Sequence, residues 1–264
     1  MKKTYRIIDI HTHIFPDKVA EKAVLNIGNY YNLKMSGKGT VDDLLETGRQ
    51  NGVEKFVVHS SATHAEQVRA INDFIAKTAK EHDNIIGFGT LHPGIKNPDA
   101  EVQRIISSGL KGIKLHPEFQ NFNIDDRSMM PIYASIQGKL PLLIHMGDEN
   151  RDSSSPERLS NVLRLFPDLT VIAAHFGGYR MWNDSCRYLT GKNLYMDTSS
   201  SLAFLKPEEA VNMIRNHGAG KFLFGTDYPM WDFSEELDRF LNLDLTEQEK
   251  DAILYSNAAR LLNI

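Results

Sequence analysis

The chain has 264 residues, of which 41% are hydrophobic, so it can bury roughly three-quarters of its unfolded surface in one large domain. Its net charge of -4 gives no electrostatic case for nucleic acid or an anionic membrane as a partner, and no run approaches the roughly 18 apolar residues of a membrane span. The single cysteine excludes an intramolecular disulfide, and the apolar residues after Lys2 and Lys3 are too few for a signal-peptide core, so we expect a cytoplasmic protein.

Short apolar runs rich in β-branched residues recur along the whole chain, and we predict a strand at each. In chain order the predicted strands are residues 5–13, 53–60, 85–92, 110–116, 140–146, 169–175, 194–199 and 222–227. Amphipathic segments lie between them, and several begin with proline, which suits the first turn of a helix. The clearest predicted helices are residues 65–82, 98–108, 127–138, 156–166 and 207–217.

Strands that alternate with helices over this length predict a (β/α)8 barrel, with residues 1–264 forming a single domain. A doubly wound open sheet is the alternative, because the number of strands alone does not close a barrel. Two connections, residues 14–40 and 117–127, are longer than a βα unit needs. Both follow the carboxyl end of a predicted strand, where barrel enzymes build their sites, so they are candidates for a substrate lid.

The first predicted strand ends in Asp9-Ile10-His11-Thr12-His13. Since successive side chains of a strand alternate between its faces, Asp9, His11 and His13 point the same way, with the two imidazoles roughly 6.6 Å apart along the strand. Two imidazoles so placed can bind one metal ion. The alternatives are a pair of hydrogen-bonded surface histidines and, for Asp9, a buried hydrogen-bonded carboxylate.

The later predicted strands also end in residues that can bind metals. Most of the histidines lie at such ends, at positions 11, 13, 59, 92, 116, 145 and 175, and the last two strands end with Asp197 and Asp227. A structural hydrogen bond explains the presence of His59 or of His92 when each is considered alone. Core packing does not explain why so many histidines lie at the same end of the predicted strands. A ring of imidazoles and carboxylates at the mouth of a barrel is what a metal-dependent catalytic site needs.

Six short motifs follow one another along the chain: Asp9-x-His11-x-His13, Gly112-x-Lys114-x-His116-Pro117, Leu143-x-His145-x-Gly147, Ala174-His175-x-Gly177-Gly178, Phe224-Gly225-Thr226-Asp227-Tyr228-Pro229 and Asn257-x-x-Arg260-Leu261. In this order they resemble the amidohydrolase superfamily, in particular its branch of short enzymes related to aminocarboxymuconate semialdehyde decarboxylase. The resemblance implies a distorted (β/α)8 barrel of the metal-dependent hydrolase type, with one or two divalent metals.

Carried over to the matching positions, the resemblance makes His11, His13, His145 and Asp227 the metal ligands. It makes His175 a catalytic residue in mononuclear members and a second-metal ligand in binuclear ones. Three neutral imidazoles and a carboxylate suit Zn²⁺ best, although Mn²⁺, Fe²⁺ or Co²⁺ can occupy such a set. Asp227 would also be catalytic, because one of its oxygens can accept the proton of a metal-activated water.

The fourth predicted strand carries Lys114 and His116, whose matching parity lets both face the barrel interior. In binuclear amidohydrolases a carboxylated lysine on this strand bridges two metals, so Lys114 and His175 are the candidate second-metal ligands. We favour Lys114 as a cationic contact for an anionic substrate, with His116 also binding the substrate. A buried ion pair is the remaining alternative for Lys114.

The sequence leaves the reaction open. We expect metal-assisted hydrolysis of a small, anionic amide, ester or lactone, because some aromatic acid decarboxylases of the family carry Glu where this chain has His11. The alternative is non-oxidative decarboxylation of a small unsaturated or aromatic acid by the same ligand set. A metal-free barrel that only binds a ligand agrees poorly with a full ligand set. The partner is in each case a small molecule, and a homo-oligomer remains open.

Overall fold

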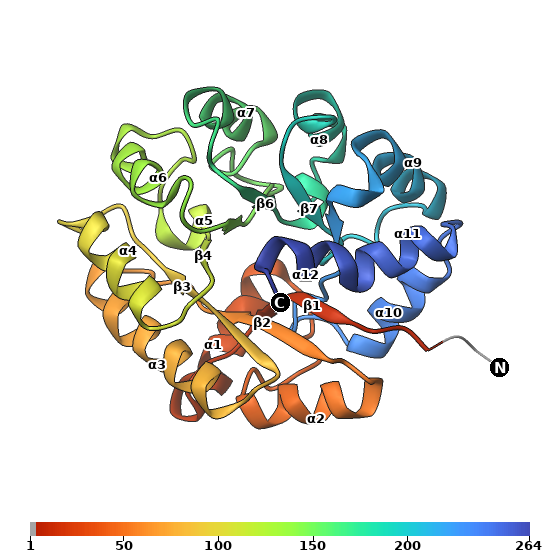
Figure 1. Cartoon of the computed structure of the whole chain (residues 1–264), viewed down its shortest axis with the longest axis horizontal. Coiled ribbons are helices and arrows are strands. Elements are labelled where there is room, and N and C mark those ends of the chain that lie inside the picture. The colour runs from red at the N-terminus through yellow and green to blue at the C-terminus, as the bar shows by residue number, and fades with distance from the viewer. Residues whose placement is uncertain (1–3) are drawn as a thin grey trace. The chain divides into compact units, whose positions relative to one another are not determined.

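Figure 1 shows the computed structural model, which describes residues 4–264. The strands lie in one sheet in the same order as in the chain, and neighbours from β3 to β7 pair in parallel. This is the strand order of a (β/α)8 barrel, so the predicted fold is confirmed. The strands are β1 (Ile8–His13), β2 (Lys55–His59), β3 (Ile85–Thr90), β4 (Gly112–Leu115), β5 (Leu142–Ile144), β6 (Val171–Ala173), β7 (Tyr195–Asp197) and β8 (Phe222–Leu223).

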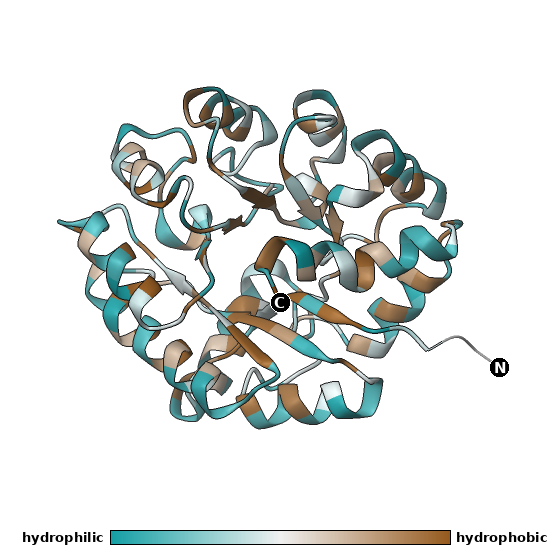
Figure 2. Ribbon diagram, viewed as in Figure 1, coloured by the Kyte–Doolittle hydropathy of each residue, from teal (hydrophilic) through white to brown (hydrophobic). Residues whose placement is uncertain are grey.

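Helices follow the strands, and their hydrophilic residues alternate with hydrophobic ones, whereas the strands are mostly hydrophobic (Figure 2). None of the helices among residues 4–264 is long and apolar enough to cross a membrane. The helices are α1 (Asp17–Tyr31), α2 (Val41–Asn51), α3 (Val68–Glu81), α4 (Pro98–Ser107), α5 (Pro117–Gln120), α6 (Met130–Ile136), α7 (Pro156–Leu165), α8 (Trp182–Leu189), α9 (Pro207–His217), α10 (Phe233–Leu241), α11 (Glu247–Asp251) and α12 (Asn257–Leu262), with a π-helical turn at Ala252–Ser256.

Every predicted strand is present, but each is shorter than its apolar run. The predicted strands are too long because buried apolar residues continue beyond the backbone pairing, as at β5, where Leu140 and Met146 lie outside the strand. Residues 14–40, expected as a long connection, contain the helix α1. Only Ala20 and Gly28 of this helix are buried, so its sequence carries little of the apolar periodicity that marks a helix.

The chain divides into two compact units, which we describe separately: a terminal unit, Met1–Val58 with Thr198–Ile264, and a central unit, His59–Asp197. In the terminal unit β1 lies beside the segment that follows β8. The Ile10 amide donates to the Phe224 carbonyl at 2.9 Å, and the Asp227 amide donates to the His11 carbonyl at 2.9 Å. These bonds fix the end of β1 against the segment that carries Asp227.

The central unit contains the parallel strands β3 to β7, whose apolar side chains are buried. Close packing of β3 on β4 requires glycine at position 112, since a Cβ atom there would lie 2.5 Å from the Phe88 ring. His116 and His145 come directly after β4 and β5, and His175 comes two residues after the end of β6. Parallel pairing therefore brings these three histidines to the same edge of the sheet.

Candidate functional site

In the terminal unit three candidate ligand atoms converge. The Oδ1 atom of Asp227 lies 3.3 Å from Nε2 of His11 and 3.2 Å from Nε2 of His13. All three side chains are largely buried, His13 being the most exposed at 15%. Two imidazole nitrogens that face one buried carboxylate oxygen fit a divalent cation, which would compensate the carboxylate charge and accept both nitrogen lone pairs.

Asp9 lies beneath these residues as a fully buried carboxylate. Its Oδ1 atom accepts hydrogen bonds from the backbone amides of His11 at 3.0 Å and Thr226 at 3.1 Å. Its Oδ2 atom accepts from the Thr226 hydroxyl at 2.6 Å. Asp9 is therefore a buried, hydrogen-bonded carboxylate, which is one of the two roles expected for it. It joins β1 to the segment that follows β8.

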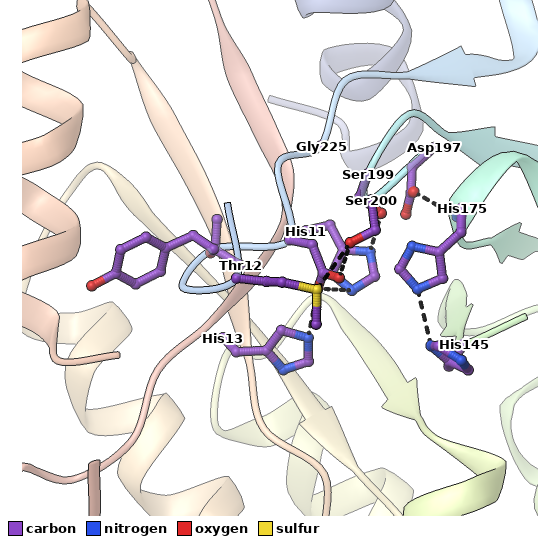
Figure 3. A network of polar contacts seen from close by, with 12 residues as sticks. His11, Thr12, His13, His145, His175, Asp197, Ser199, Ser200 and Gly225 are labelled. Atoms are coloured by element: carbon purple, nitrogen blue, oxygen red, sulfur yellow. Dashed lines mark hydrogen bonds and ion pairs between the residues drawn. The ribbon is translucent and has the colours of Figure 1, made fainter. Parts of the chain in front are cut away.

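Two serines that the sequence analysis missed contact the candidate ligands. The Ser199 hydroxyl lies 3.0 Å from Nδ1 of His11 (Figure 3). The Ser200 hydroxyl donates to Oδ2 of Asp227 at 2.5 Å. Serine is not a typical metal ligand, so its presence in a sequence does not indicate a metal site. The available signal is the hydroxyl run Thr198-Ser199-Ser200-Ser201, which spans the end of the predicted strand 194–199 and the residues after it, where a solvent-exposed turn is the ordinary interpretation.

In the central unit His145 and His175 are paired. Nε2 of His175 lies 2.9 Å from Nδ1 of His145, and both rings are buried (Figure 3). Nε2 of His145 lies 2.9 Å from the Gly147 carbonyl oxygen, which can only accept, so this nitrogen carries the proton. The Nδ1 atom of neutral His145 therefore holds the lone pair. It accepts the hydrogen bond from Nε2 of His175 and is the atom that could instead bind a metal.

Asp197, which ends β7, acts on His175 through the backbone. Its Oδ1 atom accepts a hydrogen bond from the His175 amide at 2.9 Å. The His175 carbonyl accepts from Nε1 of Trp182 at 3.1 Å, and the residue has a left-handed φ of 61°. These bonds hold a strained backbone and so determine where the imidazole of His175 lies.

The predicted substrate-binding residues lie on and after β4. Lys114 is fully buried within the strand, and His116 caps α5. The His116 ring stacks on His145 with centroids 4.0 Å apart and an interplanar angle of 10°. The expected contacts of Lys114 and His116 with a substrate remain predictions.

Glu118, on α5, was also missed. Burial raises the pKa of this carboxyl group to about 7, and its Oε1 atom accepts from the Ser154 hydroxyl at 2.5 Å. Oε2 lies 3.5 Å from Nδ1 of His116 and 3.9 Å from Nε2 of His145, so these residues form a further candidate metal group. The stacked rings of His116 and His145, however, direct their nitrogen lone pairs within two parallel planes, so the lone pairs do not converge on one point. In addition, Nε2 of His145 carries a proton. The cluster is therefore poorly suited to a metal ion.

Comparisons with known proteins identify the family of the chain. The model of a family described as amidohydrolase matches residues 8–264. The γ-resorcylate decarboxylase of Polaromonas sp. (strain JS666 / ATCC BAA-500) is 22% identical, over 75% of this chain and 77% of that protein. The resemblance to the amidohydrolase superfamily that the six motifs indicated is confirmed.

Solved structures share the fold. The 5-carboxyvanillate decarboxylase of Sphingomonas paucimobilis superposes with a TM-score of 0.74 at 18% identity, covering 99% of this chain and 100% of that chain. The dihydroxybenzoic acid decarboxylase of Polaromonas sp. JS666, with bound manganese and the inhibitor 2-nitroresorcinol, gives a TM-score of 0.76 at 17% identity, covering 98% of this chain and 97% of that chain.

The expected hydrolase activity is wrong. The relatives above are decarboxylases of γ-resorcylate, 5-carboxyvanillate and dihydroxybenzoic acid, which favours the alternative of decarboxylation. The expectation of hydrolysis rests on His11 alone, because some aromatic acid decarboxylases of the family carry Glu at that position. Both residues supply one donor atom to a metal, and the same ligand set serves both reactions.

Proposed function

Because the chain belongs to the amidohydrolase family, we propose that it is a metal-dependent, non-oxidative decarboxylase of a small unsaturated or aromatic acid. The convergence of His11 Nε2, His13 Nε2 and Asp227 Oδ1 carries this proposal. The decarboxylases among the relatives supply the reaction type. The proposal treats residues 1–264 as one catalytic domain, in keeping with a family match over residues 8–264.

The proposed ligands of the metal are His11, His13, His145 and Asp227. Three neutral imidazoles and one carboxylate suit Zn²⁺ best. The first alternative is Mn²⁺, which is bound in the structure of the Polaromonas dihydroxybenzoic acid decarboxylase. When bound, the metal would accept substrate oxygens and stabilise the negative charge on them. We expect one metal per chain and an unmodified Lys114 that attracts the substrate carboxylate.

Decarboxylation breaks the bond between the substrate carbon and its carboxylate, leaving the electron pair on that carbon as CO₂ departs. An acid must then supply a proton to form the new C–H bond. We assign this proton transfer to the His175 imidazole, which as an imidazolium also stabilises negative charge on the substrate, and we assign to Asp227 the binding of the metal. His116 would orient the substrate, since its ring packs flat on His145.

Detection of CO₂ from a panel of acids tests the proposal. The purified protein is incubated with 2,6-dihydroxybenzoate, 5-carboxyvanillate and β-unsaturated carboxylates, and in parallel with lactones and amides. We expect CO₂ from at least one acid, loss of that activity with a chelator, and recovery with Zn²⁺ or Mn²⁺. Turnover of a lactone or amide by metal-loaded protein that releases no CO₂ from any acid would contradict it.

A further inference from the structure

The segment that follows β7 places two hydroxyl groups on two different candidate metal ligands. Ser199 and Ser200 are almost completely buried, and both belong to the terminal unit that also holds His11 and Asp227. Neither serine is a candidate ligand itself. Their contacts decide instead which atoms of His11 and Asp227 remain available to a cation.

Ser200 occupies one of the two carboxylate oxygens of Asp227. The Trp231 Nε1–H group donates to the Ser200 hydroxyl oxygen at 2.8 Å, and indole nitrogen can only donate. The Ser200 proton is therefore directed to Oδ2 of Asp227, 2.5 Å away. Oδ1 is the oxygen that faces the two imidazoles. The relay from Trp231 through Ser200 thus leaves Asp227 with one oxygen for a metal.

Ser199 acts on the opposite side of His11. Its hydroxyl lies 3.0 Å from Nδ1, while Nε2 of the same ring faces Asp227 at 3.3 Å. A ring that binds a metal through Nε2 carries its proton on Nδ1, where the Ser199 oxygen accepts it. The contact thus holds the ring in the orientation that directs Nε2 to Asp227, and it provides an acceptor for the Nδ1 proton.

We propose that Ser199 and Ser200 are positioning residues of the metal centre, an inference that rests on the proposed function. Ser200, held by Trp231, makes Asp227 a one-oxygen ligand, and Ser199 fixes His11 as an Nε2 ligand. Partners of this kind orient metal ligands, and their removal lowers metal affinity by roughly 10- to 100-fold.

Ser200→Gly is the decisive variant. Ser200 has a left-handed φ of 50°, which glycine adopts without steric penalty, so the substitution removes the hydroxyl without straining the fold. Ser199→Ala removes the second hydroxyl, and Trp231→Phe removes the indole donor but keeps an aromatic ring. The matched control is Ser201→Ala: this buried hydroxyl lies in the same segment but donates to the Ser199 carbonyl at 2.9 Å.

The measurements are the affinity of each full-length protein for Zn²⁺ and Mn²⁺ and the melting temperature of the metal-free form. We expect Ser200→Gly and Ser199→Ala to bind metal about 10- to 100-fold more weakly. Trp231→Phe should lose less, and Ser201→Ala should match the parent. The metal-free melting temperature of Ser200→Gly should also stay near that of the parent, which separates positioning from folding.

Affinities for Ser200→Gly and Ser199→Ala that equal the parent value would overturn the inference, as would an equal loss in Ser201→Ala. The proposed function fails differently: a parent that binds metal but releases no CO₂ from any acid would overturn decarboxylation and leave the affinity comparison valid. A parent that binds no divalent metal would overturn both.

Discussion

Gly147 shows how a single residue fixes the chemistry of a neighbouring imidazole. Its carbonyl oxygen holds the proton of His145 on Nε2. The residue has a φ of 82°, and a Cβ atom there would lie 2.4 Å from the Tyr179 carbonyl oxygen. No residue with a side chain fits this position without a backbone shift, which would move the carbonyl away from His145.

Gly147→Ala should therefore destabilise the chain by about 3 kcal/mol or more, through a left-handed backbone and a clash together, and should weaken metal binding. Gly138→Ala separates the two causes, since Gly138 has a similar φ of 69° but no atom within 4 Å of its added Cβ. It should cost only about 1 kcal/mol in the free energy of unfolding. Equal losses in the two variants, measured by urea unfolding, would show that the close approach to Tyr179 is unimportant.

His175→Asn separates a catalytic residue from a metal ligand. Asparagine keeps a polar group of similar size but cannot carry the positive charge of an imidazolium. Turnover should fall on the order of 10²-fold or more, while metal content stays near that of the parent. His217→Asn, a change of another buried histidine, should keep the parent turnover per metal-loaded chain. Metal loss in proportion to activity in His175→Asn would make His175 a ligand.

At the scale of elements, the strand ends were predictable and the turns after them were not. Alternation along β1 placed His11 and His13 on one face, as the structure has them. The strand β8, in contrast, is only two residues long, and Asp227 lies four residues beyond its end. Backbone bonding to His11, which no sequence pattern signals, brings Asp227 to the imidazoles.

Glu118, Ser199 and Ser200, which the sequence did not indicate, are all buried, and each forms a hydrogen bond to a buried polar side chain. Glu118 lies on a four-residue helix, and Ser199 and Ser200 lie in a turn, where polar side chains are ordinarily solvated. Their importance arises from neighbours distant in sequence, such as Ser154 for Glu118 and His11 for Ser199. Periodicity and local motifs carry no information about such contacts.

Helix α10 makes the stability of the chain dependent on pH. Phe233 and Phe240 pack edge-on against Phe224 with ring centroids 5.8 and 5.6 Å apart, and Glu236 is buried on the same helix. Burial raises the pKa of Glu236 from 4.5 to about 7, with the charge of Asp227 adding to the rise and Arg239 opposing it. The folded chain therefore holds this proton to a higher pH than the unfolded chain does.

The contribution of Glu236 to stability is thus fully present below about pH 4.5 and is lost as the pH rises through about 7. Between about pH 5 and pH 8 the loss amounts to about 2–3 kcal/mol. Glu236→Gln should remove that part of the pH dependence in urea unfolding. Glu235→Gln, which changes an exposed partner of the same Arg239, should keep it. An unchanged pH dependence in Glu236→Gln would refute the assignment.

At the scale of the whole molecule, the alternation of strands and helices predicted every strand of the sheet, and the six motifs favoured the (β/α)8 barrel over an open sheet. The reaction was not predictable in the same way. A metal held by three imidazoles and one carboxylate can activate water or bind the oxygens of an acid. The reaction depends on the substrate that the site accepts, which the ligand residues do not encode.

The metal content of the purified protein tests the central claim most directly. Elemental analysis of the parent should find close to one divalent metal per chain, and that of the His11→Ala/His13→Ala protein should find almost none, because two imidazoles lost from a four-ligand set have no substitutes. Two metals per chain in the parent, or full occupancy in the double variant, would contradict the metal centre described here.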